Sequence, residues 1–227
     1  VGVSVVKVLR GLGVTVGFPQ DQTCCGQPVY NTGYNHEARK LARRVLEQFR
    51  DSGYVVVPSG SCAATLRVFY LELFAEDPKL LEEAKALAAK TYEFSEFLVK
   101  VLKVEDAAAC GATHQGTATY HPSCHLLREL GVKSGPRKLL RSVPGLEEKE
   151  LEGAEICCGF GGTFSVKFPH ISEGMVGDKI ANVQSSGAET LVSCDMSCLM
   201  NIGGALNRQG SSVKVRHLAQ ILDADSD

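Results

Sequence analysis

Apolar residues recur at intervals of three and four along several segments, which is the spacing of an amphipathic helix. The clearest case is residues 35–50, where one stripe is apolar and the basic residues lie on the opposite face. Asp77 and Pro78 have the form of an N-cap and a first helical residue, so we expect a helix that runs to about Lys90. Other helices are predicted over residues 5–12, 95–103, 124–130, 137–141, 171–183 and 199–206.

Short apolar runs between these helices predict strands. Residues 54–57 and 190–193 are apolar on both faces, which is typical of strands at the centre of a parallel sheet. Further strands are predicted over residues 14–18, 117–121 and 150–156. Because strands and helices alternate, we predict an α/β fold with Rossmann-like parallel sheets that are flanked by helices.

One short stretch of sequence occurs twice, and its surroundings occur twice as well. The tetrapeptide TCCG begins at Thr23, and ICCG begins at Ile156. Each is followed by a helical run, an apolar strand and a further cysteine, Cys62 in the first copy and Cys198 in the second. The repeat therefore predicts two similar modules related by a pseudo-twofold axis.

We place the modules at residues 1–106 and 116–227, joined by an Ala- and Gly-rich linker. The second module has a strand that leads to Cys124 before its Cys-Cys pair, and the first has no matching strand or cysteine. We expect the natural chain to extend upstream by about 10–15 residues, enough for one strand and its turn. We also expect the first sheet to be one strand shorter than the second, with an open edge.

Composition and charge narrow the class of protein. A hydrophobic fraction of 44% with 22% charged residues is typical of a soluble globular protein. The net charge of −2 gives no basic footprint for nucleic acid. We find no apolar run as long as a transmembrane segment and no signal peptide. Nine cysteines in such a chain favour reduced thiols, so we expect a cytoplasmic protein.

We expect seven of the nine cysteines, the six of the repeat together with Cys124, at the carboxyl ends of the strands, where parallel sheets bind ligands. The candidate ligands are Cys24, Cys25 and Cys62 in the first module and Cys124, Cys157, Cys158 and Cys198 in the second. Converging thiolates suit an iron–sulfur cluster or zinc. Adjacent cysteines splay their side chains, which fits a cluster better than a single zinc ion.

The remaining candidates are weaker. Cys110 is expected to be a small core residue. Cys194 is expected to be a core residue, with a metal ligand or a spare thiol as the alternative, because Pro58 stands at its place in the first copy. His121 and His125 flank Cys124, and local hydrogen bonding is the preferred interpretation for both, with metal ligation as the alternative. No catalytic residue is assigned.

Five motifs in order resemble a known family of cysteine-rich iron–sulfur subunits. They are QTCCGQP at 22–28, PSGSC at 58–62, HPSCH at 121–125, CCGFGGTF at 157–164 and DMSCLM at 195–200. The module is similar to that of the cysteine-rich heterodisulfide reductase subunit and of the glycolate oxidase iron–sulfur subunit, and most similar to the lactate utilisation protein A family. The resemblance implies an electron-transfer subunit with [4Fe-4S] clusters in an L-lactate (2-hydroxy acid) oxidising complex, which needs the other subunits of that complex for turnover.

The chain also departs from these relatives. It lacks the opening cysteine of the first module and the ferredoxin segment of the glycolate oxidase subunit, and it has Cys-x-x-x-Cys at 194–198 where heterodisulfide reductase has Cys-x-x-Cys. Two other functions therefore stay open. One is a thiol/disulfide oxidoreductase of heterodisulfide reductase type, and the other is a zinc-stabilised assembly module without redox chemistry.

Overall fold

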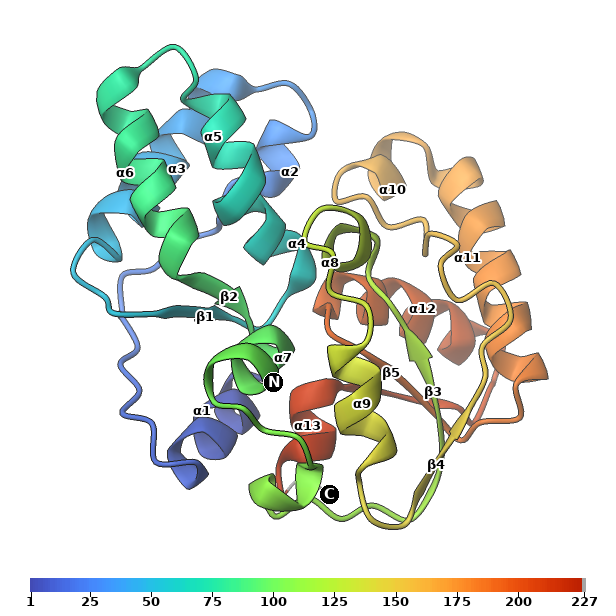
Figure 1. Cartoon of the computed structure of the whole chain (residues 1–227). Coiled ribbons are helices and arrows are strands. Elements are labelled where there is room, and N and C mark those ends of the chain that lie inside the picture. The colour runs from blue at the N-terminus through green and yellow to red at the C-terminus, as the bar shows by residue number, and fades with distance from the viewer. Residues whose placement is uncertain (226–227) are drawn as a thin grey trace.

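The computed structural model describes residues 1–225. Two α/β units lie side by side, the N-terminal one drawn from blue to green and the C-terminal one from yellow to red (Figure 1). Helices flank a parallel sheet in each unit, which confirms the predicted fold class. Within the described residues, no helix combines the length and the apolarity needed to cross a membrane.

The N-terminal unit is mostly helical, with two short strands. Its elements are α1 (Gly2–Gly11), α2 (Gln27–Tyr30), α3 (Asn35–Gln48), β1 (Val55–Val57), α4 (Gly60–Ala64), η1 (Thr65–Phe69), α5 (Tyr70–Leu73), α6 (Pro78–Lys90), β2 (Thr91–Glu93), α7 (Phe94–Glu96), η2 (Phe97–Val101) and η3 (Ala107–Cys110). The helix predicted from Asp77 begins as expected, because the Asp77 side chain accepts a hydrogen bond from the Leu80 N–H at 3.2 Å.

The C-terminal unit carries the larger sheet. Its elements are β3 (Gly116–His121), α8 (Cys124–Arg128), α9 (Gly135–Arg141), β4 (Leu146–Lys149), α10 (Phe164–Lys167), α11 (Pro169–Ser185), β5 (Thr190–Ser193), α12 (Met196–Arg208), β6 (Lys214–His217) and α13 (Leu218–Leu222). Its strands run parallel in the order β4-β3-β5-β6. The predicted strand over 190–193 is central, as expected, because β5 lies between β3 and β6.

The first sheet is smaller than expected. It has two strands, β1 and β2, so it is two strands shorter than the second sheet and not one. Residues 54–57 were predicted to be central, yet β1 pairs with β2 alone among the described strands. The prediction is wrong because Val55 packs on one hydrophobic core and Val56 on another, so that β1 is apolar on both faces without being central.

Two predicted strands are absent from the described chain. Residues 14–18 are not paired as a strand, and the partly buried Val14 and Val16 pack on the core instead. The corresponding strand of the second unit, β4, pairs with β3, and the first unit shows no equivalent of β3 among residues 1–225. Residues 150–156 form a turn, and the strand of this region lies earlier, at Leu146–Lys149. Because the residues of this strand are mostly polar, a search for apolar runs does not find it.

The largest hydrophobic core is shared by the two units. Val5 and Leu9 of α1, together with Phe94 before η2, pack in one cluster with Tyr120 of β3 and Leu218 of α13. Each unit also has its own core, around α3 and α6 in the first and around α11 and α12 in the second. The contact between the units is therefore as apolar as a domain interior, and we expect them to unfold together.

Helices α4 and α8 cross at the junction of the two units (Figure 1), and a glycine permits their close approach. A Cβ atom added to Gly60 would lie 2.6 Å from the Leu126 Cβ, which is closer than real carbon contacts. The Gly60 N–H also donates to the Cys194 carbonyl at 3.1 Å, and this hydrogen bond limits how far α4 can move away from α8.

We predict that Gly60→Ala lowers the free energy of unfolding by about 1–3 kcal/mol, the usual cost of overpacking. Gly174→Ala is the matched control, because Gly174 is also helical and its added Cβ meets nothing within 4 Å. The free energy of unfolding of that control should be unchanged or should rise by up to about 1 kcal/mol, because alanine has a higher helix propensity than glycine. Urea denaturation of both variants measures the difference, and equal stabilities would contradict the assigned contact.

Glu93, at the start of α7, is fully buried (0% exposed). Burial raises its pKa to about 7, although its Oε2 accepts hydrogen bonds from the Ser95 and Glu96 N–H groups. The pKa of Glu93 is therefore higher in the folded state than in the unfolded state. Its contribution to the free energy of unfolding is fully present below about pH 4.3 and is lost as the pH rises through 7.

We therefore predict that, between pH 4.5 and 8, the free energy of unfolding of the wild-type chain falls by on the order of 3 kcal/mol relative to that of Glu93→Gln. One pKa unit corresponds to about 1.4 kcal/mol. Urea denaturation of both proteins across this range tests the prediction, since other titrating groups are common to both. A stability difference that does not change with pH would show that Glu93 stays ionised.

Candidate metal centre

The three repeat cysteines of the first unit form one pocket. Cys24 and Cys25 lie on the loop before α2, and Cys62 lies in α4, where the Ser59 side chain caps the helix by accepting from the Cys62 N–H at 3.4 Å. The Cys25 thiol donates to the Cys62 sulfur at 3.2 Å. The Tyr70 hydroxyl donates to the Cys25 carbonyl at 2.7 Å and fixes the loop against the helices.

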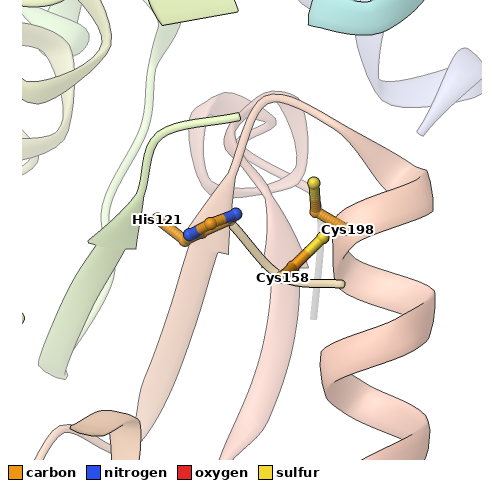
Figure 2. Close-up of side chains that lie close together, drawn as sticks. All are labelled: His121, Cys158 and Cys198. Carbon is orange, nitrogen blue, oxygen red and sulfur yellow. The ribbon is translucent and has the colours of Figure 1, made fainter. Parts of the chain in front are cut away.

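The second pocket gathers side chains from three places in the chain. One ring nitrogen of His121 and the sulfur atoms of Cys158 and Cys198 lie within 4.8 Å of one another, and Figure 2 shows these side chains turned toward a common space. Cys157 interacts with Cys124 on one side and with Cys158 on the other. The four cysteines proposed for this unit are therefore brought together.

The glycine after each Cys-Cys pair has the same role in both pockets. The N–H groups of Gly26 and Gly159 each donate to the sulfur of the first cysteine, Cys24 or Cys157, at 3.4 Å. Both glycines have a left-handed backbone, with φ of 87° and 80°. A Cβ on Gly159 would also lie 2.8 Å from the Ser172 carbonyl oxygen, so no larger residue fits there.

One part of the expected arrangement is wrong. Cys62, Cys124 and Cys198 lie in helices that follow β1, β3 and β5, as predicted, but neither Cys-Cys pair follows a strand. The loops that precede both pairs, 14–23 and 150–156, are irregular. The second pair is held by a hydrogen bond from the Asn201 side chain to the Cys158 carbonyl at 2.8 Å.

Hydrogen bonding among the thiols divides them into proton donors and acceptors. The single Cys25 proton is shared between the sulfurs of Cys62 and Cys24, which lowers the pKa of Cys24 to about 6 and raises that of Cys25. In the second pocket, donation from Cys124 and Cys158 places the pKa of Cys157 well below its usual range. Each pocket thus favours a thiolate at the first cysteine of its pair, and thiolates are the form that binds metals.

His121 is a candidate ligand to which the sequence analysis gave too little weight. It is 1% exposed, and neither ring nitrogen has a well-formed hydrogen bond to a described residue. Burial, with the nearby Lys179 charge, lowers its pKa to about 4, so the ring is neutral. The preferred interpretation as a local hydrogen-bonding residue is therefore wrong for His121, whose nitrogens face the cysteines. Its place at the end of β3, one turn before Cys124, is the sequence signal for this role.

The comparison with known sequences agrees with the repeat. A sequence model of the cysteine-rich domain family matches residues 1–67 and 118–203, and each matched segment contains one Cys-Cys-Gly and the cysteine that follows it. Lactate utilization protein A of Bacillus subtilis (strain 168) is 53% identical over 224 residues, which cover 99% of this chain and 92% of the relative. The chain belongs to the cysteine-rich lactate utilization protein A family.

Other members of the family match over similar lengths. The protein from Geobacillus kaustophilus (strain HTA426) is 52% identical over 224 residues, covering 99% of this chain and 92% of the relative. The one from Lysinibacillus sphaericus (strain C3-41) is 50% identical over 223 residues, covering 98% of this chain and 96% of the relative.

The remaining cysteines of this family member lie outside both pockets. Cys194 is fully buried in the shared core, where the Tyr120 hydroxyl donates to its sulfur at 3.6 Å. Cys110 packs at the edge of the same core. His125 has the local role that was preferred for it, because its ring contacts the Cys124 sulfur at 3.6 Å and the Gln27 amide at 3.4 Å.

A surface cavity of about 700 Å³ lies on the other side of the loop that leads to Cys157. Its basic lining residues are largely paired, as Arg137 is with Glu148 and Glu150, and Lys133 with Glu155. None of the nine cysteines lines it, so this cavity and the thiol pockets are separate features.

We predict that iodoacetamide labels Cys24 at least about tenfold faster than Cys110 at pH 7 in reduced, metal-free protein. The pKa of Cys24 is lowered to about 6, and burial raises that of Cys110 to about 11. The larger thiolate fraction outweighs the lower nucleophilicity of a more acidic thiol. Mass spectrometry of timed samples gives both rates, and equal rates would exclude the hydrogen bonding assigned to the first pocket.

Proposed function

We propose that this chain is an iron–sulfur electron-transfer component of a lactate-oxidising system. The observation that carries the proposal is the gathering of seven cysteines into two pockets built on the same Cys-Cys-Gly loop. The names of the relatives, lactate utilization protein A, support the link to lactate.

The residues present fit an iron–sulfur cluster, which when bound supplies one-electron redox chemistry. Cys124, Cys157, Cys158 and Cys198 would hold it in the second unit, where the hydrogen-bonding capacity of the buried His121 ring is unused by the described residues. Cys24, Cys25 and Cys62 would hold a second one with three thiols. The N–H groups of Gly26 and Gly159 orient and stabilise the first thiolate of each set.

The chemistry of lactate points to partner subunits. Oxidation of a 2-hydroxy acid removes two electrons and two protons from one carbon and its hydroxyl, and we assign that step to another protein of the system. The chain's own residues provide thiol pockets near the surface, with Cys24 itself exposed. Exposed apolar side chains neighbour the cysteines of the second pocket in sequence, as expected for a surface that meets a partner. They are Ile156, Val166, Phe168, Ile171, Met196 and Met200.

A zinc centre is the second candidate, because the compact grouping of His121, Cys158 and Cys198 would also suit a single ion. The cluster is favoured because each pocket uses an adjacent cysteine pair and the second unit supplies four thiols besides the imidazole. Thiol/disulfide exchange through Cys194 has less support, since that thiol is fully buried beside Tyr120, outside the pocket.

We predict that anaerobically purified or reconstituted protein contains iron and sulfide and has a broad absorption band near about 400 nm. Cys158→Ser should lower the iron content of the second pocket to background, because serine is a poor ligand for iron in such clusters. Cys110→Ser is the matched control and should leave iron, sulfide and absorption unchanged.

Metal analysis and absorption spectra of the three proteins decide between the candidates. Colourless protein with about one zinc per pocket would establish the zinc centre instead. Loss of iron in the Cys110→Ser control would show that the wrong cysteines have been assigned. The purified chain alone should oxidise little lactate with an artificial acceptor, and robust turnover would contradict a carrier role.

A further inference from the structure

Lys179 lies behind the second pocket, on the buried face of α11. Its side chain is fully buried (0% exposed), and its Nζ donates to the carbonyl oxygens of Gly153 at 2.7 Å and Ala154 at 3.1 Å. Both carbonyls belong to the loop that leads to Cys157. Carbonyl groups are neutral, so these bonds position the ammonium group without balancing its charge.

The groups that can balance the charge of Lys179 are in the pocket. Within residues 1–225, the salt bridges include no carboxylate partner for Lys179. Burial lowers its pKa, and the groups that act in the opposite direction are the thiols of Cys158, Cys157 and Cys198. Because a buried charge is costly without a partner, the fold is built for a pocket that carries negative charge.

Among the described residues, the first pocket has no such cation as a buried neighbour. Helix α3 follows the first Cys-Cys pair as α11 follows the second, and its buried residues are all apolar. They are Ala38, Ala42, Val45 and Leu46. The polar group that contacts the loop there is the Tyr70 hydroxyl, which is neutral. The two pockets therefore share their loops but differ in charge.

We propose that Lys179 is a positioning residue that serves as the built-in counter-charge of the second thiolate centre. This inference rests on the proposed function and extends it to the difference between the two centres. A nearby buried cation favours thiolates that hold a metal ion, and it favours an added electron. Lys179 should therefore raise both the metal affinity and the midpoint potential of the second centre.

The first test measures metal affinity in the full chain. Cys25→Ser and Cys62→Ser are introduced to silence the first pocket, and Co²⁺ binding to the metal-free protein is followed by its thiolate charge-transfer absorption. Lys179→Met should weaken Co²⁺ binding by about tenfold or more, because the uncharged side chain no longer balances the thiolates. Lys214→Met is the control, since Lys214 is an exposed lysine of the same unit.

The second test measures the midpoint potential of the reconstituted protein in the same background. In Lys179→Met the centre should bind the added electron about tenfold more weakly. This corresponds to a midpoint potential that is lower by about 59 mV for a one-electron couple. Lys179→Gln removes the charge but keeps an N–H donor for the carbonyls, so it should shift the potential in the same direction. Lys179→Arg keeps the charge and should stay closer to wild type.

The outcomes separate this inference from the proposed function. If iron and sulfide are bound but neither neutral variant changes the Co²⁺ affinity or the potential, the counter-charge is refuted and the electron-transfer proposal survives. If no iron centre assembles but Lys179→Met and Lys179→Gln still weaken Co²⁺ binding, the counter-charge holds and the redox proposal fails. A change in Lys179→Met that is absent in Lys179→Gln would assign Lys179 to loop structure alone.

Discussion

One buried carboxylate organises the junction on which both pockets depend. Asp195 is 1% exposed, and its Oδ2 accepts from the Ser61 N–H at 2.8 Å, the Ser59 hydroxyl at 3.2 Å and the Ser123 hydroxyl at 3.5 Å. Its Oδ1 accepts from the Ser197 N–H at 3.0 Å. Burial raises its pKa, but the hydrogen bonds from Ser197 and Ser61 outweigh that effect and lower it, so the group is an anion.

The position of Asp195 explains why the pockets are neighbours. It is the N-cap of α12, and its partners Ser59 and Ser123 stand at the N-cap positions of α4 and α8. These are the helices that carry Cys198, Cys62 and Cys124. One carboxylate therefore aligns the starts of three helices, each of which places one proposed ligand. In the repeat, Ser59 occupies the position of Asp195. The two copies therefore differ at this N-cap position, where a serine caps its own helix in the first copy and an aspartate also binds groups of the other unit in the second.

The sequence predicted what depends on periodicity and repetition. The helix over residues 35–50, the capped helix after Asp77 and the central strand at 190–193 all follow from local spacing and are confirmed. The sorting of seven cysteines into two sets was predicted from the repeat and the motifs, and the structure places Cys25 beside Cys62 and Cys158 beside Cys198. The strand at 146–149 was missed because its residues are mostly polar, and the strand predicted at 14–18 failed because strand formation needs a partner as well as a pattern.

The residues that tune the site could not be predicted, because their roles arise from burial. Lysine and aspartate are expected at the surface, and only the folded chain shows that Lys179 and Asp195 are inside. Their charges are placed differently. Asp195 is shared by both units and is balanced by hydrogen-bond donors, whereas Lys179 belongs to the second unit, and the groups that favour its charged form are the thiols of the second pocket. The duplicated backbone thus gives two similar thiol pockets, and one buried cation makes them electrostatically unequal. Under the proposed function, this difference would give electron transfer between the two centres a preferred direction, which two identical pockets would lack.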